Sequence, residues 1–158
     1  MFEFEEEAVH ALVSRQIKPG DVLVIRYEGP RANGMPEMYY AAAILSADRV
    51  LNTTTAIVTD GRYSGAMQGP CIGHVAPEAI DGGPIALVTE GDLIEINVPE
   101  RRLAIVGVGG EHRAPEDIEA VLADRKRIWK PLRPRHDTGI LALYSRVARG
   151  APDGASIT

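Results

Sequence analysis

Apolar residues follow helical spacing at the start of the chain and then form short β-branched runs. Residues 5–15 place Ala8 and Leu12 four positions apart, which predicts a helix that ends before Pro19-Gly20. The runs 21–27 and 54–59 are rich in valine, isoleucine and threonine, so we expect two strands. The stretch 29–36 between them is predicted to be a loop. The Ala-rich segment from Pro36 is predicted to be a helix, with proline allowed in its first turn.

The second half of the chain predicts grouped strands followed by helices. A short turn is expected at 77–80, strands at 84–89, 93–98 and 102–106, and helices at 115–129 and 139–148, with a loose tail after them. Because these strands are grouped rather than alternating with helices, we expect a mixed α/β fold. A small barrel-like sheet flanked by helices fits this order better than a doubly wound parallel sheet.

Composition narrows the class of protein. The chain has 158 residues, which we interpret as one domain (1–158), and 45% of them are hydrophobic, enough for a core. Its net charge of -5 argues against nucleic acid or an anionic membrane surface as a partner. We find no signal peptide and no apolar run near the roughly 20 residues of a membrane span. A cytoplasmic protein is expected, and the acidic run 5–7 is predicted to be a solvated helix face.

Two segments carry candidate chemistry. In the loop 60–65, Gly61 and Gly65 would let backbone amides approach a ligand closely, with Ser64 between them. Ser64 also fits an ordinary turn serine that bonds to its own backbone. It is not part of a Gly-x-Ser-x-Gly nucleophile elbow, because the residue two before it is Arg62 and not glycine. Glu37, expected in the first turn of a helix, fits either a carboxylate favoured by the helix dipole or one ligand of a metal ion.

Cys71 and His74 have the spacing of a zinc-ligand pair. Zinc would need a second such pair, and Cys71 is the only cysteine of the chain. We therefore interpret them as a buried cysteine and a structural histidine.

Taken together, the motifs resemble the C-terminal part of dihydroxy-acid dehydratases and their sugar-acid relatives. The resemblance rests on the ordered set VIRYEGP (24–30), GMPEM (34–38), TDGRYSG (59–65), CIGHV (71–75), GGPIALV (82–88), WKP (129–131) and LALY (141–144). The matching motifs are distributed over nearly the whole chain.

The resemblance implies a swivelling β/β/α domain that closes over a larger N-terminal domain. That domain would carry an iron-sulfur cluster, which this chain does not bind, and most ligands of a Mg²⁺ ion. Complete enzymes of this kind remove water from a 2,3-dihydroxy acid to give a 2-keto acid, in branched-chain amino acid synthesis. The resemblance implies that Ser64 is the base, that Glu37 reaches the magnesium, and that Arg62 and Gly65 bind substrate.

The implied partners are the N-terminal dehydratase domain or subunit, the dihydroxy acid and a second copy in a homodimer. The chain alone is expected to be inactive. The loop at 32–35 has fewer glycines than is common in the family, which leaves the substrate open. The alternatives are a sugar-acid dehydratase domain, or a non-catalytic binding module that kept the fold.

Overall fold

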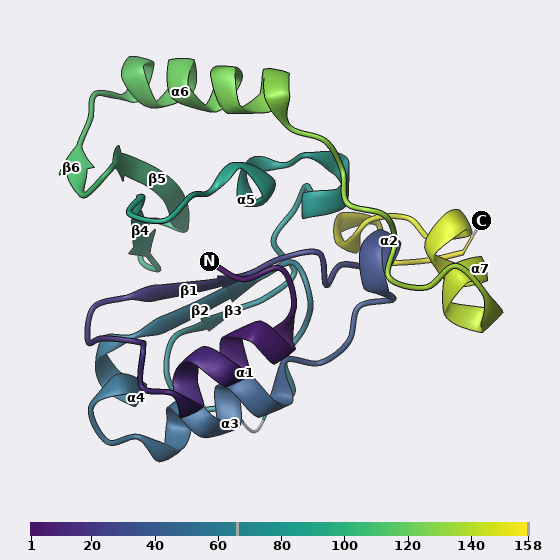
Figure 1. Ribbon diagram of the computed structural model, residues 1–158, viewed down its shortest axis with the longest axis horizontal. Coiled ribbons are helices and arrows are strands. Elements are labelled where there is room, and N and C mark those ends of the chain that lie inside the picture. Colours follow the sequence, from purple (N-terminus) through teal and green to yellow (C-terminus); the bar gives the residue numbers. More distant parts are fainter. Residues whose placement is uncertain (66, 158) are drawn as a thin grey trace.

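The computed structural model describes residues 1–65 and 67–157, and it confirms the mixed α/β class. Two small sheets lie in the middle of the molecule, with helices on their outer sides (Figure 1). The first sheet is parallel and the second is antiparallel, and no closed barrel joins them in the described residues.

The first sheet places the loops of interest at one edge. It pairs β1 (Val22–Ile25) with β2 (Ala56–Thr59), and β2 with the short β3 (Cys71–Ile72), all parallel. Ile25 lies opposite Thr59, so the loops that follow β1 and β2 leave the sheet side by side. Both strands were predicted from their unbroken apolar runs, which are typical of strands covered on both faces. β3 was missed because it has only two residues.

β1 contributes to two hydrophobic clusters. Leu23 and Ile25 pack with α1 (Glu5–Val13) and α3 (Tyr39–Ala47), whereas Val24 points to the opposite face and packs against α5 (Pro84–Leu87). The alternation of side chains along a strand produces this division. The crossover from β1 to β2 also contains α2 (Pro30–Asn33) and α4 (Leu51–Thr54), where a loop and a strand start were predicted.

The second sheet is an antiparallel β4 (Leu93–Asn97), β5 (Arg102–Val108) and β6 (Glu111–His112), covered by α6 (Pro115–Ile128) (Figure 1). The strand predicted at 84–89 is wrong, because Pro84–Leu87 forms α5. Gly83 is extended and Pro84 occupies the first helical turn, where proline favours a helix start.

The C-terminal region folds back on α7 (Gly139–Val147). Tyr144 Oη donates to the carbonyl of Ala155 at 2.7 Å, and Ala148 pairs with Ile157. The predicted loose tail is therefore ordered up to residue 157 and includes a 3₁₀ turn, η2 (Ala151–Asp153); an equivalent turn, η1 (Ala79–Asp81), precedes α5. None of the helices described could cross a membrane.

Candidate functional site

A buried carboxylate, Asp60, organises the loops at the edge of the first sheet. It follows β2 directly and is fully buried. Its oxygens accept the backbone N–H groups of Tyr27 at 3.2 Å, Glu28 at 2.9 Å and Ala79 at 2.8 Å. Burial raises the pKa of Asp60, and these amides act against that rise. Asp60 thus fixes the loop after β1 and the turn at 78–79 around the start of the loop 60–65.

The backbone brings Glu37 and the serine loop together. The backbone N–H of Arg62 donates to the carbonyl of Pro36 at 3.3 Å, and the carbonyl of Arg62 accepts the N–H of Met38 at 2.8 Å. Glu37 and Arg62 therefore form a parallel β-bridge. Ser64 lies two residues beyond this bridge and is half-buried, as Glu37 is, while Arg62 is exposed. Glu37 was expected in the first turn of a helix, but α3 begins at Tyr39. Glu37 instead lies in an extended segment.

The two glycines of the loop have different surroundings. A Cβ on Gly61 would lie 3.0 Å from the Cβ of Glu28 and 3.2 Å from the carbonyl oxygen of Pro36, so only glycine fits without displacement. A Cβ on Gly65 would have no heavy atom of the described, non-adjacent residues within 4 Å. Gly61 therefore serves the packing of the protein itself, and Gly65 faces open space that a ligand could enter.

Glu5 belongs to the surroundings of Glu37, although the run 5–7 was predicted to be a solvated face. That prediction is wrong for Glu5, whose half-buried carboxylate accepts the N–H of Ala41 at 2.9 Å in the first turn of α3. Burial raises the pKa of Glu5, and repulsion from Glu6 and Glu37 acts in the same direction. Two acidic side chains close to each other in this way favour a cation beside them.

Two further buried acids flank Asp60. Glu28 accepts the N–H of Glu5 at 2.9 Å and the side-chain amide of Asn33, and Glu78 accepts the N–H of Arg31 at 3.0 Å. Burial raises the pKa of each to about 7. The sequence analysis did not predict that Asp60, Glu28 and Glu78 lie together, because they are far apart in the sequence. The one local signal was at Asp60, an acidic residue placed between a predicted buried strand and a glycine.

Cys71 and His74 have different surroundings. The half-buried Cys71 thiol is near the carbonyl of Gln68 at 3.9 Å, and burial raises its pKa. His74 is exposed, and its backbone N–H donates to the carbonyl of Gly61 at 2.9 Å. Across residues 1–65 and 67–157, no group of three or more histidine, cysteine or acidic side chains is arranged to hold a metal ion.

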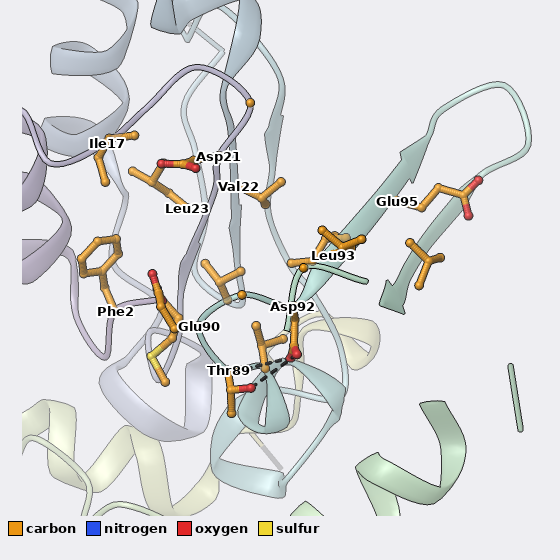
Figure 2. Close-up of a pocket in the computed structure, with 18 of the residues that line it drawn as sticks. Phe2, Ile17, Asp21, Val22, Leu23, Thr89, Glu90, Asp92, Leu93 and Glu95 are labelled. Carbon is orange, nitrogen blue, oxygen red and sulfur yellow. Dashed lines mark hydrogen bonds and ion pairs between the residues drawn. The ribbon is translucent and has the colours of Figure 1, made fainter. Parts of the chain in front are cut away.

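A cavity of about 730 Å³ lies away from the serine loop, between β1 and the segment 89–95 (Figure 2). Asp21, Glu90 and Glu95 line it, and Asp92 in its wall already pairs with Arg125 at 2.5 Å. Glu90 and Glu95 are paired as well, with the N-terminal amine of Met1 at 2.7 Å and with Arg102 at 3.1 Å. Because these charges are already matched, the cavity has little to attract the carboxylate of an acid substrate.

Comparison with known proteins identifies the family. Residues 1–155 match the family model described as dihydroxy-acid/6-phosphogluconate dehydratase C-terminal. Over 98% of its length the chain is 47% identical to a protein named dihydroxy-acid dehydratase from Roseiflexus castenholzii. Over 99% it is 45% and 43% identical to proteins of that name from Geobacter metallireducens and Archaeoglobus fulgidus. The chain spans about a quarter of these relatives, 26%, 27% and 26% of their lengths. Its motifs, in their order along the fold, and this match show that the chain belongs to the dihydroxy-acid/6-phosphogluconate dehydratase C-terminal family.

Proposed function

We propose that the chain is the C-terminal part of a hydro-lyase that converts a 2,3-dihydroxy acid into a 2-keto acid. The observation that carries the proposal is the bridge between Glu37 and Arg62, which brings the GMPEM segment and the serine loop together. The three relatives named above are all dihydroxy-acid dehydratases, which favours this substrate class over a sugar acid.

Ser64 is proposed as the base. Its alkoxide takes the proton from C2 of the substrate, the electron pair of that C–H bond forms the C2–C3 double bond, and the C3 hydroxyl leaves with its bonding pair as hydroxide. The hydroxide takes this proton back from the Ser64 hydroxyl, which gives water and restores the alkoxide, and the enol becomes the 2-keto acid when its C2 hydroxyl proton moves to C3. A serine alkoxide requires positive charge and amide donors beside it. Arg62, two residues away, and the backbone at Gly65 are the groups of this chain that could supply them.

Glu37 is proposed to ligate Mg²⁺. A carboxylate suits this hard cation, and the nearby Glu5 adds negative charge that favours it. When bound, the ion would supply positive charge for the substrate carboxylate and C2 hydroxyl. Glu37 and Glu5 make only part of a ligand set, so the remaining ligands would come from the N-terminal part of the enzyme.

The iron-sulfur cluster does not fit the residues of this chain. Its one cysteine is half-buried and its thiol has a raised pKa, whereas a cluster needs several thiolates. We assign the cluster to the N-terminal domain or subunit, with the enzyme acting as a cytoplasmic homodimer. Tyr39 and Tyr40, 50% and 67% exposed just after Glu37, fit a surface that such a partner covers.

A chimera tests the proposal. The chain would replace the C-terminal quarter of the Roseiflexus castenholzii relative, and 2-keto acid formation from a 2,3-dihydroxy acid would be measured. The chimera should be active. Ser64→Ala should lower kcat by about 10²–10⁴-fold or more, because a general base typically contributes that much to the rate. Glu37→Gln should be partly rescued by excess Mg²⁺, whereas Ser64→Ala should not.

The matched control is Ser14→Ala, an exposed serine at the far end of α1. It should leave kcat unchanged. Exchange of the C2 proton with solvent reports on the base, because it requires removal of that proton but not loss of the C3 hydroxyl. Native exchange in the Ser64→Ala chimera would show that Ser64 is a turn residue.

A further inference from the structure

A second polar pocket lies between the segment 133–137 and α7, and none of its lining residues belongs to the serine loop. Its volume is about 390 Å³. Three arginines line it, Arg133, Arg135 and Arg146, together with His136, Ser145 and one carboxylate, Asp137. In a chain with a net charge of -5, this is a local excess of positive charge.

The three arginine side chains differ in how many hydrogen bonds and ion pairs they make within the protein. Arg135 pairs with Glu6 at 2.6 Å, and Arg146 makes only a long contact of 3.4 Å to the carbonyl of Asp137. Arg133 makes no hydrogen bond or ion pair with any described residue. At least one guanidinium group is therefore available to an incoming anion.

Ser145 provides an independent sign of a ligand. It is only 8% exposed and lines the pocket, yet its Oγ has no hydrogen-bond partner among the described residues. Buried hydroxyl groups nearly always have a partner, and a helical serine can bond to a carbonyl one turn back. The Ser145 hydroxyl lies just beneath the pocket lining on α7, so it is an unused donor that a ligand would reach by a change of rotamer.

His136 is held in a fixed orientation at the same pocket. Its Nε2 is 2.9 Å from Oδ1 of Asn33, whose amide nitrogen donates to the buried Glu28. Because Asn33 presents its oxygen to the ring, Nε2 is the donor in this pair. In the neutral ring Nδ1 is then an acceptor, so His136 offers an anion no donor and instead holds the segment 133–137 against α2.

We propose that this pocket binds an oxyanion, a carboxylate or a phosphate, through Arg133, Arg146 and the Ser145 hydroxyl. We take its ligand to be separate from the dihydroxy acid that undergoes dehydration. Two sources share this chemistry: a small free oxyanion, and an acidic side chain from the N-terminal part of the enzyme.

The test is a titration of the chain with inorganic phosphate and with acetate, followed by two-dimensional NMR against chloride at matched ionic strength. Saturable shifts should appear at residues 133–137 and 142–146. Arg133→Gln and Ser145→Ala should each weaken binding about tenfold, the loss expected for one hydrogen bond to a charged group. Arg127→Gln, an exposed arginine of α6 paired with Asp124, is the control and should leave the affinity unchanged.

Absence of saturable shifts with either anion, or equal affinity in all variants, would overturn the proposal. The chimera separates the two sources. Phosphate binding that persists in the chimera indicates a free oxyanion. Phosphate binding that is present in the chain but lost in the chimera indicates a protein carboxylate in the pocket. Neither result depends on dehydratase activity, so the proposed function is tested separately.

Discussion

The change Asp60→Asn tests the buried carboxylate that organises the candidate site. The two side chains have the same shape, but asparagine offers one acceptor oxygen in place of two. If that oxygen takes the Oδ2 position, it keeps the N–H groups of Tyr27 and Ala79. The asparagine amide would then face the N–H of Glu28, which loses its acceptor at 2.9 Å.

The expected cost follows from these contacts. One buried N–H without an acceptor costs about 1–3 kcal/mol, and the two retained bonds weaken because their acceptor is no longer charged. Removing a buried charge, whose pKa burial raises, offsets part of the loss. We expect Asp60→Asn to lower the free energy of unfolding by about 2 kcal/mol.

Urea unfolding followed by circular dichroism measures this quantity. With an m-value of about 2 kcal/mol/M, the midpoint should fall by about 1 M. The control is Asp117→Asn, an exposed acid in the first turn of α6, which should change the free energy by less than about 0.5 kcal/mol. If Asp60→Asn is as mild as the control, Asp60 does not organise these loops. In the chimera, the Asp60 variant should also lower kcat under conditions where it is fully folded.

Two further predictions concern packing and pH. Gly61→Ala should cost about 1–3 kcal/mol because its Cβ would crowd Glu28 and Pro36, whereas Gly65→Ala should be nearly neutral; equal costs in urea unfolding would refute this. Glu78 has a pKa raised from 4.5 to about 7, so the folded chain binds this proton more tightly than the unfolded chain and loses stability as pH rises from 4.5 to 7. Glu78→Gln should flatten this part of the stability profile, and an unchanged slope would contradict the assignment.

Local sequence patterns predicted the long elements well. α1, α6 and α7 follow helical spacing with clear ends, and β4 and β5 are separated by a turn. The run at 84–89 misled because a short apolar run suits a buried strand or a buried helix equally. Pro84 at the start of this run favours a helix, because proline suits the first helical turn.

The site was only partly accessible from sequence. The resemblance predicts roles for Glu37 and Ser64, and the structure places their segments together. The roles of Asp60 and Glu5 depend on backbone N–H groups more than fifteen residues away, at Ala79 and Ala41. No spacing rule reports such contacts, because they arise only once the sheet has brought distant loops to one edge.

The two-faced burial of β1 has a consequence for how the molecule opens. Leu23 and Ile25 belong to one hydrophobic cluster and Val24 to the other, so neither layer can separate from β1 without exposing core side chains. Local fluctuations that free helices at either surface leave this strand protected. The backbone amides of β1 should therefore exchange with solvent deuterium only through global unfolding, and their exchange rates would report the stability of the whole domain.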